Sequence, residues 1–260
     1  MRFLALIPAR YASTRFPAKP LAILGGRMII QRVYERVSKV FSHVYVATDD
    51  ERISKAVESF GGRAILTSTS HQSGTDRCYE ALCKVGENDF DVVVNVQGDE
   101  PFIAAAQLET IKRCFDDAET QIATLVKPFA PGMGFDDLQN PNSPKVVVSD
   151  TDYALYFSRS VIPFLRGYER SEWLKTHKYL KHIGLYAYRT AVLKQITSLP
   201  QSPLEKAESL EQLRWLQAGF KIKVGYTNEE TIGIDTPEDL LRAEQFLNEN
   251  NYKQTTKCYL

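Results

Sequence analysis

The sequence predicts an α/β protein with a mostly parallel sheet flanked by helices and a smaller α+β lobe. In the first half of the chain, short apolar segments alternate with amphipathic segments, which is typical of parallel strands joined by crossover helices. Residues 3–7 and 91–96 are apolar along almost their whole length, as strands covered on both faces are. A proline-rich segment at residues 128–144 then interrupts the alternation and indicates a long connection or a domain edge.

Each predicted strand of the first half is followed by a predicted helix. Residues 27–40 carry apolar side chains at three- and four-residue spacings, which indicates an amphipathic helix. Gly61 and Gly62 end the next helix, because glycine adopts the backbone conformations that close a helix. In chain order, we expect strands at residues 3–7, 43–47, 64–66 and 91–96, and helices at residues 27–40, 51–60, 75–85 and 104–115.

The second half has a different rhythm. Pro237 suits the first position of a final helix, with Thr236 or Asp235 as its cap. We expect strands at residues 145–149, 153–157, 181–188 and 221–224, helices at 203–217 and 236–248, and an exposed loop at 166–178. The chain accordingly divides into a core at residues 1–127, a smaller lobe at 128–200, a return to the core at 201–248 and a loose tail at 249–260.

Composition excludes several classes of protein. The 260 residues are 43% hydrophobic and 25% charged, and this composition is too apolar for a disordered chain. A chain of this length can bury a sizeable hydrophobic core. No stretch reaches the roughly 18 apolar residues of a membrane helix, and the apolar start is too short for a signal peptide. We therefore expect a cytoplasmic protein without a membrane span.

The net charge of zero hides an asymmetry. The first 34 residues contain six basic side chains and no acidic one, so the rest of the chain has 26 basic against 32 acidic residues. A balanced total argues against binding to nucleic acid, whereas a local basic segment in an enzyme-sized chain indicates a small anionic ligand.

The basic segment follows the first predicted strand. Residues 8–19, PARYASTRFPAK, combine three long cations with two hydroxyl side chains. Ligands of open α/β sheets bind beyond the carboxyl ends of the strands, and several converging cations suit a triphosphate. The loop matches neither the dinucleotide fingerprint nor the Walker motif. Its candidate ligand-binding residues are Arg10, Ser13, Thr14, Arg15 and Lys19.

Two further loops end predicted strands. Residues 67–77, TSTSHQSGTDR, offer small hydroxyl side chains, Gly74 for close backbone approach, and Arg77. Residues 97–101 place Asp99 at the tip of a buried strand, where a carboxylate can hold Mg²⁺ against phosphate oxygens. Asp235 is a second candidate, although an aspartate in such a stretch is more often a helix cap, and only the resemblance described below favours it as a ligand.

These motifs, taken together, resemble the 3-deoxy-manno-octulosonate (Kdo) cytidylyltransferases, also called CMP-Kdo synthetases. The resemblance covers residues 1 to about 247, and Ala18 departs from it because the family commonly has glycine there. The motifs that carry the resemblance, in chain order, are IPARYASTRFPAKPL, SGTDR, VNVQGDEP, YALYFSR, KHIGLYAY, SPLEKAESLEQLRWL and GIDTPEDL.

The resemblance implies a nucleotide-diphospho-sugar transferase fold, with a Rossmann-like core and a lobe used for sugar binding and dimerisation. It implies Mg²⁺-dependent activation of Kdo by CTP, giving CMP-Kdo and pyrophosphate for lipopolysaccharide biosynthesis, and a homodimer. Arg10, Lys19, Asp99 and Asp235 would be catalytic, the two aspartates by holding the metal ion. The nucleotide would also contact Ser13, Thr14, Arg15, Ser73, Arg77 and Gln97, and the sugar would contact Arg159, His182, Tyr186, Glu211 and Gln212.

The residue types of the sugar set suit an acidic sugar. Arg159 can pair with a carboxylate in two-pronged fashion, and the other members can bind hydroxyl groups. On a continuous helix, Glu208, Glu211, Gln212 and Trp215 would share one face.

Three other functions remain open at this stage. One is a cytidylyltransferase for another acidic sugar, such as a sialic acid, but the first loop of that family is less similar to residues 8–19 of this chain. A nicotinamide-dependent oxidoreductase lacks its glycine fingerprint here. A catalytically silent nucleotide-binding module would not need both aspartates and the basic loop.

Overall fold

The computed structural model describes residues 1–12, 15–130 and 132–257, with side chains described as far as residue 249. The described chain forms two units, each compact by itself. The first unit holds Arg2–Phe90, Asn95–Ala105 and Glu230–Leu260, and the second holds Asp91–Val94 and Ala106–Glu229 together with Met1. The segment expected to form the smaller lobe, residues 128–200, belongs to the second unit.

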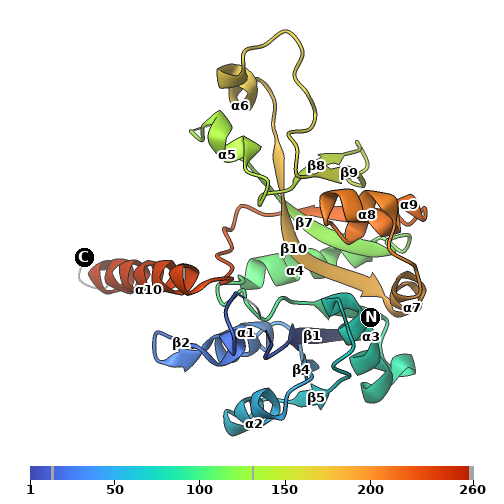
Figure 1. The fold of residues 1–260 in the computed structure, drawn as a ribbon, viewed down its shortest axis with the longest axis vertical. Coiled ribbons are helices and arrows are strands. Elements are labelled where there is room, and N and C mark those ends of the chain that lie inside the picture. The colour runs from blue at the N-terminus through green and yellow to red at the C-terminus, as the bar shows by residue number, and fades with distance from the viewer. Residues whose placement is uncertain (13–14, 131, 258–260) are drawn as a thin grey trace. The chain divides into compact units, whose positions relative to one another are not determined.

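Parallel strands form the centre of the first unit. β1 (Phe3–Ala9) pairs in parallel with β4 (Val44–Thr48), which pairs in parallel with β5 (Ala64–Leu66) (Figure 1). Helices α2 (Glu51–Ser59) and α3 (Gly74–Val85) follow β4 and β5. The predicted alternation of strands and helices is confirmed in this unit.

A short hairpin stands before the first helix, where the sequence predicts helix from residue 27. β2 (Ile23–Leu24) pairs antiparallel with β3 (Arg27–Met28), and α1 (Ile29–Val37) begins only after it. Gly25 and Gly26 make the turn with φ angles of 51° and 78°, a conformation that tight hairpins require and glycine adopts readily. The turn chemistry of this glycine pair therefore overrides the helical spacing around it.

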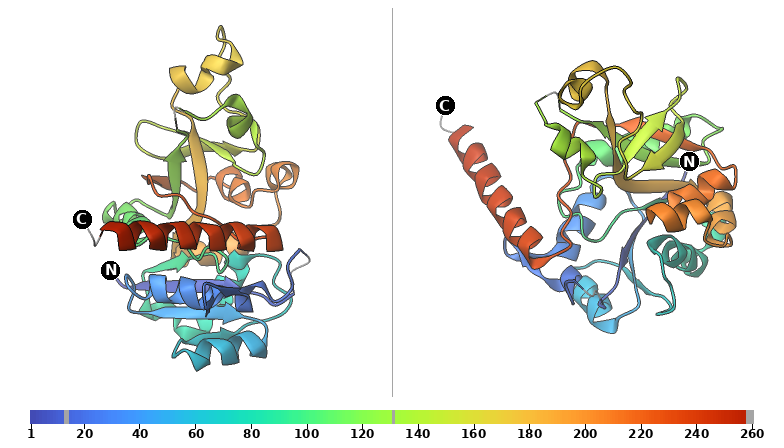
Figure 2. Two further views of the ribbon diagram at one scale, coloured as in Figure 1. Left: turned by 90° about the vertical axis from the view of Figure 1, so that its left-hand side faces the viewer. Right: turned by 45° about the horizontal axis from the view of Figure 1, so that its top comes forward.

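The last helix belongs to the first unit and is longer than predicted. Helix α10 covers Pro237–Lys257, whereas the sequence predicts its end at residue 248 and a loose tail beyond (Figure 2). Its Ala243 lies in an apolar cluster with Leu24, Ile29, Phe102 and Ile234, against which Leu240 and Leu247 also pack. Within the described residues, no helix combines the length and apolar character needed to cross a membrane.

Mixed strand pairing characterises the second unit. β10 (Leu180–Arg189) pairs antiparallel with both β7 (Ile122–Pro128) and β8 (Lys145–Val148), and β11 (Ile222–Tyr226) pairs in parallel with β7. β8 also forms an antiparallel pair with β9 (Ala154–Ser158). The remaining elements of this unit are β6 (Val92–Asn95), α4 (Ala105–Arg113), α5 (Phe135–Gln139), α6 (Trp173–Thr176), α7 (Thr190–Thr197), α8 (Pro203–Glu208) and α9 (Gln212–Gln217), with β6 ending one residue beyond the unit boundary.

The expectation of one helix over residues 203–217 is wrong. Ser209 adopts a left-handed conformation, with a φ of 50°, and separates α8 from α9. Glu208 just before it is held by contacts with Ser158 and Arg159, which fix the end of α8. Because the helix is interrupted, Glu208, Glu211, Gln212 and Trp215 do not share the single helical face that their spacing predicts.

The segment at residues 166–178 is not wholly an exposed loop. It contains α6, and the Trp173 side chain is buried in a cluster with Leu138 and Tyr179. The Trp173 indole N–H donates to the carbonyl of Tyr168. The polar composition of the segment predicts an exposed loop and gives no sign that Trp173 is buried.

Ala18 lies in the loop after β1 with a φ of 58° and a ψ of 17°, the left-handed conformation. Its N–H donates to the carbonyl of Tyr11 at 3.0 Å, and its carbonyl accepts from Leu21 at 2.9 Å. This backbone geometry explains why glycine suits the position, since the left-handed region costs other residues about 1–2 kcal/mol.

We expect Ala18→Gly to stabilise the protein. The left-handed cost of about 1–2 kcal/mol disappears, while the greater flexibility of unfolded glycine costs about 0.5–1 kcal/mol. The midpoint of thermal unfolding should therefore rise by a few degrees at most. Ala56→Gly, in the helical interior of α2, is the matched control and should lower the midpoint. A lower midpoint for Ala18→Gly would contradict the argument.

Candidate active site

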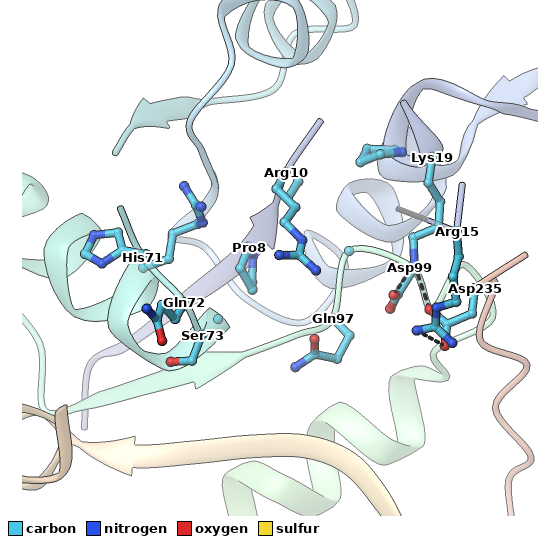
Figure 3. Close-up of a pocket in the computed structure, with 15 residues that line it drawn as sticks. Pro8, Arg10, Arg15, Lys19, His71, Gln72, Ser73, Gln97, Asp99 and Asp235 are labelled. Carbon is cyan, nitrogen blue, oxygen red and sulfur yellow. Dashed lines mark hydrogen bonds and ion pairs between the residues drawn. The ribbon is translucent and has the colours of Figure 1, made fainter. Parts of the chain in front are cut away.

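A pocket of about 290 Å³ lies within the first unit, at the carboxyl end of β1 (Figure 3). It brings together four segments that are far apart in sequence. The lining residues are Pro8, Ala9, Arg10, Arg15, Lys19, Pro20, His71, Gln72, Ser73, Gly74, Arg77, Gln97, Gly98, Asp99 and Asp235. Each loop that the sequence singles out after a strand of this unit thus contributes to one cavity.

Lys19 joins the two aspartates at one side of the pocket. Its ammonium group lies 2.6 Å from a carboxylate oxygen of Asp99 and 3.1 Å from one of Asp235 (Figure 3). Arg15 approaches Asp235 as well, at 3.3 Å. The Lys19 side chain is only 12% exposed, whereas the side chains of Asp99 and Asp235 are 32% and 51% exposed, so a largely buried cation holds two carboxylates that remain accessible from the pocket. We call Lys19, Asp99 and Asp235 the ion-pair cluster.

Backbone contacts hold the loop after β6 against neighbouring segments. A side chain on Gly98 would place its Cβ atom 2.8 Å from the carbonyl oxygen of Pro8, so only glycine permits this approach. The N–H of Ile234 donates to the carbonyl of Asp99 at 2.9 Å. These two contacts bring Asp99 beside both the loop after β1 and the segment that carries Asp235.

Thr236 caps helix α10, which decides between the two roles open to Asp235. The Thr236 hydroxyl accepts from the N–H of Asp239 at 3.2 Å, and the Asp239 carboxylate accepts from the N–H groups of Asp235 and Thr236. The carboxylate of Asp235 instead faces Lys19 and Arg15. Asp235 is therefore a pocket residue.

The other nucleotide candidates lie around the same cavity. Arg10 is exposed and, with Gln97, lines its centre (Figure 3). Ser73 caps α3 by accepting from the N–H of Asp76 at 3.1 Å, which leaves its hydroxyl hydrogen available. Ser13 and Thr14 lie outside the described residues.

Arg77 lines the pocket but is already bound to protein groups. It is 4% exposed, and its guanidinium donates to Asp49 at 2.8 Å, to the Thr67 hydroxyl at 2.6 Å and to the Ser68 carbonyl at 3.3 Å. These contacts hold the segment after β5 in place. Sequence reasoning missed Asp49, although it follows β4 directly and so meets the same positional rule as the other candidates.

His71 is a second pocket residue that sequence reasoning missed. Its ring contacts the carboxylate of Glu80, which also accepts from the N–H of Ser68 at 2.9 Å and from Lys84 at 2.7 Å. Burial alone would raise the pKa of Glu80, but these donors together lower that pKa to about 2. Glu80 therefore stays ionised and fixes His71 at the rim of the cavity.

The predicted sugar residues all lie in the second unit. Arg159, just after β9, is half-buried, and its guanidinium donates to the carbonyls of Glu208 at 2.6 Å, Pro141 at 2.8 Å and Ser209 at 3.2 Å. All three acceptors are neutral, so the positive charge of Arg159 is oriented by the protein without being neutralised there.

His182 and Tyr186 lie together on β10, with ring centres 5.3 Å apart. The Nε2 atom of His182 is 3.0 Å from the Thr124 hydroxyl. Burial lowers the pKa of His182 to about 3 and raises that of Tyr186 well above its usual range. Both side chains are therefore neutral near pH 7 and suit hydrogen bonding to hydroxyl groups.

Gln212 and Glu211 stand at the start of α9. Gln212 is 4% exposed, and its amide nitrogen has no hydrogen-bond partner among the described residues. Glu211 lies 3.5 Å from Arg214, which pairs more closely with the buried Glu205 at 2.9 Å. A buried amide donor without a partner costs free energy, which a ligand hydroxyl or a water molecule can offset.

The donor set of the ion-pair cluster fits a magnesium ion. Mg²⁺ takes one or two carboxylates and completes its shell with water and phosphate oxygens, and Asp99 with Asp235 supplies two carboxylates converging on one point. Among the described residues, no group of three or more histidine, cysteine, aspartate or glutamate side chains is arranged for a metal ion. The cluster thus suits an ion that shares its shell with a ligand.

Solved structures define the class of protein. The chain shares its fold, with a TM-score of 0.59 and 14% identity, with 4-diphosphocytidyl-2C-methyl-D-erythritol synthase from Anaerococcus prevotii, covering 95% of this chain and 99% of that one. A structure of CMP:2-keto-3-deoxy-manno-octonic acid synthetase complexed with CTP matches far more closely. Its TM-score is 0.87 and its identity 41%, over 96% of this chain and all of that one. The predicted α/β fold class is confirmed, and the class is that of the nucleotidyltransferases.

Sequence comparison then narrows the class. A family model described as cytidylyltransferase matches residues 4–223. The 3-deoxy-manno-octulosonate cytidylyltransferase of Phocaeicola vulgatus is 67% identical over 247 residues, covering 95% of this chain and 98% of that protein. The chain belongs to the 3-deoxy-manno-octulosonate cytidylyltransferase family.

We expect His182 to remain neutral at every pH above about 5, because burial lowers its pKa to about 3. The unfolded chain protonates this ring near pH 6.5, so its contribution to stability is complete above pH 6.5 and is lost as the pH falls toward 3. Titration of the ring signals of the four histidines by NMR tests this, with His182→Gln identifying the signal. A midpoint near 6.5 for that signal would contradict the burial argument.

Proposed function

We propose that this protein transfers a cytidylyl group from CTP to Kdo, forming CMP-Kdo and pyrophosphate. The observation that carries the proposal is the convergence of Arg10, Arg15 and Lys19 with Asp99 and Asp235 in one pocket. Such a pocket combines cations for a triphosphate with carboxylates for a metal ion. Family membership supports the choice of CTP and Kdo as the two substrates.

The reaction exchanges one bond to phosphorus for another. The anomeric hydroxyl oxygen of Kdo forms a bond to the α-phosphorus of CTP, and the bond between that phosphorus and the β-phosphate oxygen breaks. Pyrophosphate leaves with the bonding electron pair, and the proton of the hydroxyl is released. Because no covalent bond to the protein forms, catalysis depends on positioning and on electrostatic stabilisation.

The basic loop after β1 serves the leaving group. Arg10, Arg15 and Lys19 reach into the pocket from this loop, and the exposed Arg10 and Arg15 can meet a large anion without rearrangement of the fold. Cations placed against the β- and γ-phosphates offset the negative charge that grows on pyrophosphate as the bond breaks. The loop thus favours both nucleotide binding and bond cleavage.

Asp99 and Asp235 would hold Mg²⁺. Bound there, the ion supplies Lewis-acid polarisation of a phosphate oxygen. The two carboxylates converge on Lys19, whose positive charge offsets their mutual repulsion and holds them close together. The protein's own part is therefore to hold a compact pair of carboxylates beside the phosphate-binding loop.

The sugar set would recognise Kdo by its charge and its hydroxyl groups. Arg159 presents a guanidinium whose protein partners are neutral carbonyls, so its attraction for a carboxylate is not cancelled. The neutral His182 and Tyr186, with Glu211 and Gln212, would bind hydroxyl groups. Specificity for an acidic sugar follows from this combination.

We infer further that the protein is a homodimer and acts in the cytoplasm, where CTP is supplied. The segment expected to form the smaller lobe, residues 128–200, exposes large apolar side chains, among them Leu155 at 60% and Phe164 at 73%. Exposed apolar groups of this size on a folded surface favour an interface with another chain.

Incubation of the protein with CTP, Mg²⁺ and a panel of 2-keto sugar acids tests the function. We expect pyrophosphate release with Kdo and much less with a sialic acid, because the basic loop and the sugar set resemble those of Kdo enzymes. Mass spectrometry of the product should show CMP-Kdo. Turnover with a sialic acid in preference to Kdo would replace the proposed substrate, and no turnover with any sugar acid would overturn the activity.

Asp99→Asn should reduce kcat/KM on the order of 100-fold or more, since removing a metal-holding charge costs several kcal/mol of transition-state stabilisation. The backbone contact between Ile234 and residue 99 does not involve the side chain, so folding should be preserved. Glu238→Gln, an exposed neighbour on α10, is the control and should retain normal turnover. Near-normal activity of Asp99→Asn with Mg²⁺ would contradict the metal assignment.

A further inference from the structure

A buried lysine lies beside the sugar set without belonging to it. Lys145 is 0% exposed, and its ammonium donates to the carbonyls of Arg159 at 2.6 Å and Asn140 at 3.1 Å. Burial lowers the pKa of Lys145, and the nearby Glu208 carboxylate opposes that shift. A fully buried cation is costly unless its surroundings compensate it, so its role calls for an explanation.

The register of the sheet places Lys145 between two predicted sugar residues. It begins β8, opposite Ser158 on β9 and opposite Lys181 on β10. Arg159 follows Ser158 directly, just beyond the end of β9, and His182 follows Lys181 on β10. Lys145 thus lies on the strand between β9 and β10, opposite the residues that directly precede Arg159 and His182.

Glu208 holds Arg159 from the other side. Its carboxylate accepts from the Ser158 hydroxyl at 2.6 Å and from the N–H of Arg159 at 2.9 Å. The carbonyl of Glu208 accepts from Nε of Arg159 at 2.6 Å. The peptide N–H and the carbonyl of Arg159 are therefore each held by a charged side chain, Glu208 and Lys145 respectively.

The charges of these three residues do not cancel. Lys145 and Arg159 are cations and Glu208 is an anion, so together they carry one excess positive charge. The excess favours an anionic ligand at the Arg159 guanidinium, which is the accessible one of the two cations, because Lys145 is fully buried. Lys145 can act on such a ligand only through Arg159 and through its field.

We propose that Lys145 and Glu208 are positioning residues that set the Arg159 guanidinium for the carboxylate of the sugar acid. The inference rests on the proposed function, in which Arg159 binds that carboxylate. Two hydrogen bonds from charged side chains fix the position of the Arg159 backbone. The carbonyls of Glu208, in α8, and of Ser209, just after it, fix the position of the guanidinium group. Misplacement by a fraction of an ångström weakens a two-pronged pair, because both of its bonds depend on direction.

Lys145→Met tests the proposal, since methionine keeps the apolar length of the side chain and removes the donor. We expect the KM for Kdo to rise about tenfold, while the KM for CTP and the midpoint of thermal unfolding change little. Lys206→Met, which removes an exposed lysine from α8, is the matched control and should leave both KM values unchanged. An unchanged KM for Kdo in Lys145→Met would overturn the proposal.

A double-mutant cycle separates positioning from general stabilisation. Arg159→Ala should itself raise the KM for Kdo, and adding Lys145→Met to it should change that value less than twofold. If Lys145→Met raised the KM for Kdo by the same factor with and without Arg159, the proposal would be overturned, because Lys145 would then act without Arg159. Glu208→Gln, which keeps an acceptor oxygen and removes the charge, should behave in the same way and decides the question if Lys145→Met fails to fold.

The same measurements distinguish this inference from the proposed function. Wild-type protein that converts no sugar acid would overturn the function, and the positioning proposal with it. Normal wild-type turnover of Kdo with additive effects in the cycle would overturn the positioning proposal alone.

Discussion

The ion-pair cluster of Lys19 with Asp99 and Asp235 is the constraint on which the rest of the pocket depends. Two carboxylates converging on one point repel each other unless a cation stands between them. Here the cation comes from the loop after β1, one carboxylate from the loop after β6, and the other from the segment before α10. The cluster therefore ties together three parts of the first unit that have no sequence proximity.

Several backbone features exist to make that cluster possible. Gly98 lets its loop approach Pro8 within a distance that any side chain would forbid. The left-handed Ala18 turns the chain just before Lys19, and Thr236 takes over the capping of α10 so that Asp235 is left for the pocket. The three features lie in separate segments, and each helps to place the same three side chains. A functional site requires separate segments to converge on the same side chains in this way. Stability of the fold alone does not require it.

Much of this arrangement could be predicted from sequence, because its signals are local. Buried parallel strands are continuous apolar runs, and the rule that ligands bind at their carboxyl ends identifies the loops that hold Lys19 and Asp99. The family resemblance supplied what no local signal gives, namely the role of Asp235 and the set around Arg159. Capping chemistry alone could not choose between Asp235 and Thr236, since both side chains suit the position.

The misses have a common physical cause in contacts between distant residues. The break at Ser209 is invisible in a helical spacing, because the contacts that fix the end of α8 come from β9. Arg77 looks like a free cation until its partner Asp49 is seen 28 positions away. Trp173 lies in a polar stretch of the sequence and Lys145 is itself a charged residue, and yet both are buried. Local pattern predicts elements and loops well, whereas the partners of buried charges depend on the completed fold.

The position of Asp235 also has a consequence for synthesis. Its partner Lys19 precedes it by 216 residues, and the chain between them includes all of the second unit except Met1. During translation, Lys19 and Asp99 emerge early, while the second carboxylate is absent until most of the chain has been made. The ion-pair cluster is therefore completed late, and a growing chain carries the basic loop before it carries both of the acids that balance it.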